Sequence, residues 1–404
     1  MSRILDLVRR DISIRTAMPW FLMLALSLIY LVYIFYFGEV IIGALTSHGP
    51  RISTGLGSDF REFWSVAHLA MGRHATRIYD PAWFAAWQSA HIAPASGLQT
   101  YLQYLYPPPD ILVVLITAPF NFMGGFLVWT VLLSIVGVTL LKRSGVPWLV
   151  IGVASIGPAF TFNLLIGQLG FVTGALFISG VLAIDKRPGI AGVSLGALVI
   201  KPQAGLLGPV ALLARRRYDA LALGAIMVAC LCLAVMIISG WEIWPAYWQH
   251  GMATAHQMLV APFPTIYEQK GTSVFWMFRS FGASITWAGV AQSISATGAT
   301  LWCWTAWRRP KADRVALTAL TVTLTLLVTP YGLTTDMCGF SIMVVWLAWE
   351  RRQLEVADVL MWMWPALCPL VSIILHAELT PFILLLAAIR AQQKLPCSAA
   401  RSPF

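Results

Sequence analysis

Asp59 is the residue whose type and position most clearly suggest chemistry. It lies in the run Gly57 to Trp64 (GSDFREFW), the first strongly polar stretch after a long apolar segment, so it is expected at a membrane surface. A carboxylate within hydrogen-bond reach of a hydroxyl group can accept its proton. Asp59 with Glu62 also matches a capping box, in which the carboxylate only begins a helix. The two interpretations are compatible if Ser58 provides the cap.

Lys201 is a second candidate, because it interrupts an apolar segment in the run Val199 to Gln203 (VIKPQ). A charge at membrane depth is costly, so this cation is expected to face a cavity filled with water or ligand. The alternative is that Lys201 marks a short turn at the membrane interface and extends its ammonium group toward the headgroups.

Two later stretches add further polar candidates. Residues 241–283 form a polar loop that is rich in aromatic residues and contains the run Tyr267 to Ser273 as well as Arg279. Asp336 follows the interruption Thr329-Pro330-Tyr331 between two apolar segments. Asp336 is either an ordinary loop carboxylate or part of the same polar site as Asp59.

The composition places these residues in a membrane protein. Of 404 residues, 58% are hydrophobic and 11% are charged. A soluble fold would have to bury more apolar surface than a chain of this length can hide. The sequence therefore predicts an all-α polytopic membrane protein with about ten to thirteen crossings. The apolar runs cover 20–42, 111–141, 147–165, 168–184, 189–213, 219–240, 284–306, 315–330, 339–349, 358–375 and 381–390.

Most of the net charge of +10 comes from short basic clusters between the apolar runs. Such clusters are typical of cytoplasmic loops that face anionic lipids, so they do not imply nucleic-acid binding. The clusters are Lys142-Arg143, Lys186-Arg187, Arg215 to Arg217, Arg308 to Arg314 and Arg351-Arg352.

The six cysteines show no Cys-x-x-Cys spacing, and most lie in apolar runs, so we interpret them as packing residues. The seven histidines contain no His-Glu-x-x-His motif. His250 and His256 are six residues apart, a spacing that does not place them on one helical face. No metal site and no cofactor are implied, although a divalent cation stays open.

The charge pattern also predicts how the chain is organised. Residues 1–19 form a basic cytoplasmic N-terminus, and the run from Trp20 to Ile42 is a retained first span. Residues 20–390 then form the transmembrane domain, with a first extracytoplasmic loop at 43–110 and a second polar loop at 241–283. Residues 391–404 are a polar C-terminal tail.

Two helices are expected in the first loop. From Phe60 onward, apolar residues recur at helical spacing, which predicts a helix lying in the membrane interface with its polar side chains on the other face. A second helix is expected to begin at Asp80-Pro81, where an N-cap residue precedes proline. The expected polar face of the first helix comprises Arg61, Glu62, Ser65 and His68.

A set of ordered short motifs resembles glycosyltransferase family 87, over roughly residues 55–350. Each motif alone is weak, but their order is specific. The resemblance implies a membrane bundle of the GT-C superfamily, with interfacial helices in an extracytoplasmic loop after the first span. The motifs are Asp59-Phe60 to Ala67, Tyr79-Asp80-Pro81, Tyr106-Pro107-Pro108, Gly167-Gln168, Ala191-Gly192 to Gly196, Ile200 to Gln203, Gly271-Thr272-Ser273, and Thr329-Pro330-Tyr331 to Asp336.

The resemblance also implies an activity. Such an enzyme transfers mannose, or another hexose or pentose, from a polyprenyl-phosphate donor to a lipid or glycan acceptor. It implies Asp59 as the general base of a single inverting displacement, at the extracytoplasmic face of a bacterial inner membrane. Cations would then bind the donor phosphate, and polar side chains would bind sugar hydroxyls. The candidates for phosphate are Lys201, Arg61, Lys270 and Arg279, and those for substrate are Tyr106, Gln168, Gln203 and Asp336.

The main alternative is a secondary transporter of a polar or lipid-linked solute. Broken apolar segments that carry Lys201 and Asp336 are also typical of transporters. Against this, the chain has no paired halves with matching interruptions, and its large aromatic loop follows the first span alone. The sugar and the acceptor are not specified by the sequence.

Overall fold

The computed structural model describes residues 23, 57–92, 102–265 and 267–395. In these ranges the regular structure is helical, and the β-type pairing consists of one isolated bridge between Gly271 and Leu333. The all-α class is therefore confirmed. The predicted basic N-terminus, all but one residue of the first span and most of the C-terminal tail lie outside the described residues.

The helices of the first loop begin where the sequence predicts. Asp80 caps the second one, because its carboxylate accepts a hydrogen bond of 3.1 Å from the backbone N–H of Trp83. The elements up to residue 117 are α3 (Phe60–Leu69), η1 (Ala75–Tyr79), α4 (Pro81–His91), η2 (Pro108–Asp110), α5 (Ile111–Val114) and η3 (Leu115–Thr117).

Half of the expected polar face of α3 is buried, which corrects the prediction, whereas His68 is exposed and Arg61 is half-buried. Glu62 is 5% exposed and Ser65 is 0% exposed. The segment at residues 108–114, which forms η2 and α5, lies against α3, so the charge of Asp110 acts on Glu62. A helical period reports which residues can share a face, but it does not reveal that a later segment covers this face.

Most of the remaining helices follow the apolar runs, whereas several short helices lie within residues 241–283, which the sequence predicts as a polar loop. Proline and glycine separate many of them into short pieces. They are α6 (Phe122–Arg143), α7 (Trp148–Ser155), α8 (Pro158–Ile166), α9 (Gly170–Ala183), α10 (Pro188–Ala197), η4 (Leu198–Ile200), η5 (Pro202–Gly205), α11 (Gly208–Ala214), α12 (Tyr218–Ser239), α13 (Ile243–Ala246), η6 (Tyr247–Gly251), α14 (Met252–Val260), η7 (Glu268–Lys270), α15 (Val274–Ser280), α16 (Ile285–Trp307), α17 (Arg314–Val328), η8 (Thr334–Met337), α18 (Cys338–Arg351), α19 (Val356–Leu375) and α20 (Thr380–Gln393).

Three described helices, α6, α12 and α19, are long and apolar enough to cross a membrane. The pair α7 and α8, which is bent by 62°, adds a fourth if it is counted as one broken span. The chain is thus a membrane protein, whereas the ten to thirteen crossings predicted from the sequence stay a prediction. Several expected crossings are helices of 10–17 residues. A helix that crosses a membrane needs about twenty residues.

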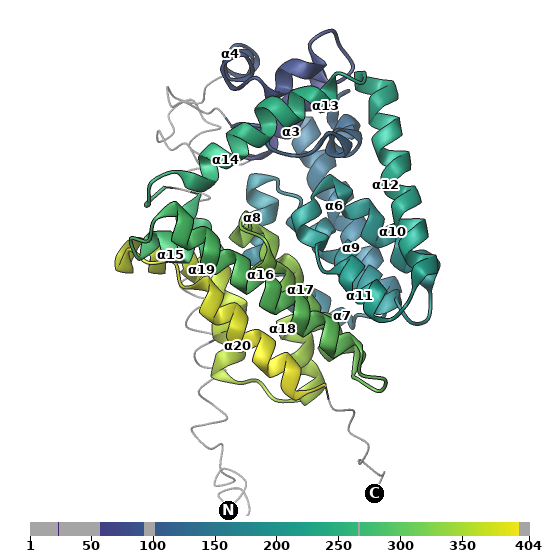
Figure 1. Cartoon of the computed structure of the whole chain (residues 1–404). Coiled ribbons are helices and arrows are strands. Elements are labelled where there is room, and N and C mark those ends of the chain that lie inside the picture. Colours follow the sequence, from purple (N-terminus) through teal and green to yellow (C-terminus); the bar gives the residue numbers. More distant parts are fainter. Residues whose placement is uncertain (1–22, 24–56, 93–101, 266, 396–404) are drawn as a thin grey trace, which may run out of the picture.

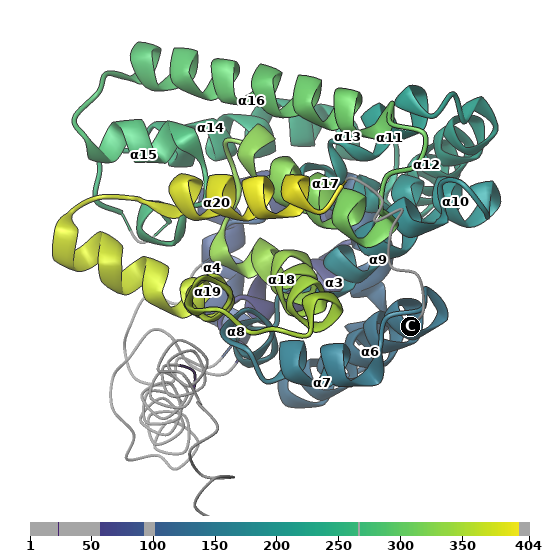
Figure 2. The same cartoon turned by 90° about the horizontal axis from the view of Figure 1, so that it is seen from below.

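The helices form two groups that share one hydrophobic core, in which α9 and α11 of one group pack against α16, α17 and α18 of the other (Figure 1). One group contains α6 and α9 to α12, and the other contains α15 to α20. The first-loop helices α3 and α4 lie with α13 and α14 at one end of the molecule (Figure 1). Seen from below, α16 runs along one edge of the molecule, and α6 and α7 lie at the opposite edge (Figure 2).

The end of the molecule that carries Asp59 has a hydrophobic core of its own. Its buried residues come from the first loop and from the adjoining ends of α6, α9 and α12. This core therefore fixes the loop to the bundle. Its largest members include Phe60, Phe63, Tyr79, Phe84, Ile111 and Trp129.

Candidate active site

Asp59 is held in place by the end of α8. The backbone N–H of Gly57 donates to the carbonyl of Leu165 (2.7 Å), and that of Asp59 donates to the carbonyl of Ile166 (2.9 Å). The next residue, Gly167, ends α8 with a left-handed φ of 81°. A Cβ at Gly167 would lie 2.6 Å from the Cβ of Phe60, so only glycine fits this turn.

The carboxylate of Asp59 points to Gln168. The Nε2 group of Gln168 donates a hydrogen bond of 2.7 Å to Oδ2 of Asp59, and the hydroxyl of Ser58 donates one of 3.2 Å to Oδ1. Asp59 precedes α3, but its side chain makes no capping hydrogen bond to that helix. The capping box considered from the sequence is therefore absent, and the carboxylate is available for another role.

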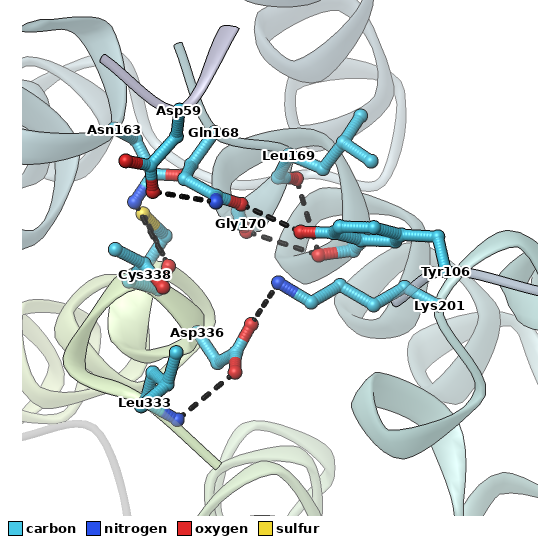
Figure 3. A network of polar contacts seen from close by, with 12 residues as sticks. Asp59, Tyr106, Asn163, Gln168, Leu169, Gly170, Lys201, Leu333, Asp336 and Cys338 are labelled. Carbon is cyan, nitrogen blue, oxygen red and sulfur yellow. Dashed lines mark hydrogen bonds and ion pairs between the residues drawn. The ribbon is translucent and has the colours of Figure 1, made fainter. Parts of the chain in front are cut away.

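Tyr106 fixes the orientation of Gln168. The phenol hydroxyl of Tyr106 donates a hydrogen bond of 2.8 Å to Oε1 of Gln168, which leaves the amide N–H groups to serve Asp59. The hydroxyl of Tyr79 in turn donates to the backbone carbonyl of Tyr106 at 2.8 Å. The three side chains of Tyr106, Gln168 and Asp59 thus form one chain of hydrogen bonds (Figure 3).

Lys201 and Asp336 form a buried ion pair beside this chain of hydrogen bonds. Their charged atoms Nζ and Oδ1 lie 2.5 Å apart, and each side chain is 4% exposed. The ammonium group also lies 5.5 Å from the ring centroid of Tyr106 (Figure 3). Lys201 is therefore not at an exposed interfacial turn, and Asp336 belongs to the same polar site as Asp59.

The local backbone explains how both charges reach this point. Lys201 has non-helical dihedrals between η4 and η5, because Pro202 begins the next turn. Asp336 lies in η8, and its Oδ2 accepts a hydrogen bond of 3.1 Å from the N–H of Leu333. The same turn lies so close to α9 that a Cβ at Gly170 would be 1.8 Å from the carbonyl oxygen of Thr335.

The surroundings of Asp59 determine how readily it accepts a proton. Burial raises the pKa of Asp59 above its ordinary value, while the hydrogen bond from Gln168 and the charges of Lys270 and Lys201 act in the opposite direction. A raised pKa makes a carboxylate a stronger base at a pH near neutrality.

Lys270 acts on Asp59 from the second group of helices. It ends η7, and the N–H of Thr272 just after it donates a hydrogen bond of 2.9 Å to the carbonyl of Gly332. The loop of Lys270 and the turn of Asp336 therefore lie side by side. The structure brings six of the predicted residues together: Asp59, Tyr106, Gln168, Lys201, Lys270 and Asp336.

Of the other three predicted residues, Arg279 lies away from this group, whereas Gln203 adjoins Asp336 and Arg61 follows Asp59 in the chain. Arg279 donates to the carbonyl of Ala283 at 2.9 Å, and its charge acts on Glu268 rather than on Asp59. Gln203 lines a small pocket together with Asp336. Arg61 follows Asp59 on α3 and is half-buried. The roles predicted for Arg61, Gln203 and Arg279 stay predictions.

Two buried carboxyl groups lie near the site: the sequence analysis missed Asp110, and it placed Glu62 on the polar face of α3. Asp110 is 0% exposed and accepts a hydrogen bond of 2.8 Å from the hydroxyl of Tyr104. Burial and the charge of Asp59 raise the pKa of Glu62 well above its ordinary value. The run Tyr106-Pro107-Pro108-Pro109-Asp110 could have indicated Asp110, because it places a carboxylate next to a predicted site tyrosine.

In the described ranges, no group of three or more His, Cys, Asp or Glu side chains is arranged to hold a metal ion. The five cysteines within these ranges are free thiols, and Cys397 lies outside them.

Comparison with known proteins supplies a family. The model of glycosyltransferase family 87 matches residues 104–330, which is more than half of the chain. The match includes Tyr106, Gln168, Lys201 and Lys270, whereas Asp336 lies shortly after its end and Asp59 lies well before its start. No curated protein and no solved structure matches significantly. The family match favours an enzyme over the transporter alternative. The chain therefore belongs to glycosyltransferase family 87 and is a membrane glycosyltransferase.

Proposed function

We propose that the protein transfers a sugar from a polyprenyl-phosphate donor to a lipid or glycan acceptor, with inversion at the anomeric carbon and Asp59 as general base. The observation that carries this proposal is the orientation of Asp59. Its carboxylate caps no helix, is held by Gln168, and lies near two cations, Lys270 and Lys201.

The reaction needs one base. The acceptor hydroxyl attacks the anomeric carbon, its proton passes to the carboxylate of Asp59, and the new glycosidic bond forms as the bond to the phosphate oxygen breaks. The electron pair of the broken bond stays on the lipid phosphate. Because this leaving group departs already ionised, no general acid is required. Glycosidases differ in that they use two carboxyl groups.

Lys201 and Lys270 are suited to bind the lipid phosphate. The charge of each acts on Asp59, so a phosphate held by them would place the anomeric carbon near the base. In this structure Lys201 is paired with Asp336, so the phosphate would compete with that carboxylate for the ammonium group. Tyr106 and Gln168 are the polar groups nearest to bind sugar or acceptor hydroxyls.

The ends of α6 support an extracytoplasmic site. At its first residue, Phe122 packs against Phe60 with ring centroids 5.5 Å apart, and its last turn carries Lys142 and Arg143. A helix of 22 residues is about 33 Å long, so Asp59 and these basic residues lie at opposite ends of a membrane-crossing helix. Basic residues favour the cytoplasmic side, so the position of Asp59 at the other end of the helix supports an extracytoplasmic site.

The donor class can be tested with purified protein in lipid nanodiscs. Labelled mannosyl polyprenyl phosphate and labelled GDP-mannose are offered separately with membrane glycolipids as acceptors. We expect transfer from the polyprenyl donor alone, with the product anomer inverted relative to the donor. Transfer from the nucleotide sugar, or retention of the donor anomer, would contradict the proposal.

A further inference from the structure

A second cluster of buried polar side chains lies at the turn between α19 and α20. Glu378 is 0% exposed and accepts hydrogen bonds from the backbone N–H of Thr380 (2.7 Å) and from the thiol of Cys368 (3.4 Å). The hydroxyl of Thr380 accepts a hydrogen bond of 2.9 Å from the indole of Trp364. None of these residues belongs to the site around Asp59.

This cluster contacts the carbonyl groups of Gln269 and Gly271, the residues on either side of Lys270. The hydroxyl of Thr380 donates to the carbonyl of Gly271 at 3.2 Å. The thiol of Cys368 lies 3.6 Å from the same carbonyl and 3.6 Å from that of Gln269. The residue after Lys270 is therefore held through its carbonyl group by a hydrogen bond from Thr380, and the carbonyl group of the residue before it lies against the sulfur of Cys368.

The same contacts continue to Asp336. Gly271 forms the isolated bridge with Leu333, and Leu333 donates its N–H to the carboxylate of Asp336. Asp336 is in turn the partner of Lys201. An unbroken series of short contacts thus leads from Thr380 to both sides of the candidate phosphate site.

We propose that Thr380, oriented by Glu378 and Trp364, is a positioning residue that sets Lys270 and the Asp336 turn for the lipid phosphate. The phosphate as ligand rests on the proposed function, whereas the positioning itself does not. Glu378 accepts the backbone N–H of Thr380, and the indole N–H of Trp364 donates to one lone pair of the Thr380 hydroxyl. The hydroxyl proton then faces two acceptors, the carbonyl oxygen of Gly271 at 3.2 Å and the weakly accepting sulfur of Cys368 at 3.3 Å.

Thr380→Val tests the proposal because it removes only the hydroxyl while keeping the shape. Thr321→Val is a matched control. Thr321 is also buried, accepts a hydrogen bond from an indole (Trp307, 2.8 Å) and donates to a carbonyl (Leu317, 2.7 Å), but it lies within α17, away from this loop. Thr380→Ser restores the hydroxyl.

The first readout is hydrogen exchange in nanodiscs, without any substrate. We expect peptides containing Thr272 and Leu333 to exchange about tenfold faster in Thr380→Val, and at the wild-type rate in Thr321→Val and Thr380→Ser. Unchanged exchange in Thr380→Val would overturn the positioning role. This result does not depend on the donor, so it stands even if the proposed function fails.

The second readout is the KM for mannosyl polyprenyl phosphate. We expect Thr380→Val to raise this KM about tenfold with a smaller change in kcat, because the loss misplaces cations that bind the phosphate. Thr380→Ser should recover the wild-type KM. A purely structural role would lower the thermal transition in both valine variants and leave the KM of each unchanged, which would overturn the proposal.

Discussion

The side-chain amide of Gln168 donates a hydrogen bond of 2.7 Å to the carboxylate of Asp59 across 109 positions of the sequence. This contact joins the start of α3 to the segment between α8 and α9. It also sets the protonation of the candidate base, because it lowers the pKa of Asp59 against the raising effect of burial. Gln168 thus orients the carboxylate and favours its ionised form, while burial keeps its pKa above the ordinary value and makes it a stronger base.

Gln168→Leu should therefore change the pH dependence of transfer. Without the amide, the pKa of Asp59 rises further, and the base is ionised only at higher pH. We expect the acid limb of the kcat/KM profile to move to higher pH and kcat to fall about tenfold. Gln292→Leu removes another buried amide, one that bonds Phe275 and Leu327, and should leave the limb at its wild-type pH. Equal profiles for wild type and Gln168→Leu would refute the coupling.

Lys201→Met should separate stability from activity. The single change leaves the buried carboxylate of Asp336 without its partner, so we expect unfolding to become easier by about 3–5 kcal/mol. The double variant Lys201→Met with Asp336→Leu should recover most of that stability, because an apolar pair replaces an ion pair at little cost. Transfer should remain lost in both. Thermal unfolding in detergent measures the stability of each variant. A stable double variant with wild-type transfer would show that this ion pair plays no part in the reaction.

Gly170→Ala tests the close approach of α9 to the turn of Asp336. A Cβ at this position would lie 1.8 Å from the carbonyl oxygen of Thr335, so one element must move. We expect a loss of stability of about 1–3 kcal/mol, together with weaker donor binding. Gly152→Ala is the control, since a Cβ there meets nothing within 4 Å. Similar thermal transitions for both variants would mean that the turn is not packed as described.

Local signals in the sequence predict the elements well. Asp80-Pro81 predicts the start of α4, and the apolar spacing from Phe60 predicts α3. The interruption at Lys201-Pro202 falls between η4 and η5. In each case the signal lies within a few residues of the feature, because capping, proline and helical period act locally.

Contacts between distant segments could not be predicted in this way. The pairs Asp59 with Gln168 and Lys201 with Asp336 join different helices, and no local pattern encodes which segments meet. The burial of Glu62 has the same origin, since a later segment covers its face of α3. The capping box at Asp59 is a local interpretation of the sequence, but in the structure the carboxylate bonds Gln168 instead of the start of α3.

The most direct test of the central claim compares Asp59→Asn with Asp80→Asn in the transfer assay from mannosyl polyprenyl phosphate. Asp80 is an N-cap outside the site, so it controls for the loss of a carboxylate from the same loop. With both variants folded and matched in amount, we predict that Asp59→Asn loses at least about a hundredfold in kcat, whereas Asp80→Asn retains the wild-type rate. Wild-type kcat in Asp59→Asn would contradict the account and move the base to Glu62 or Asp336.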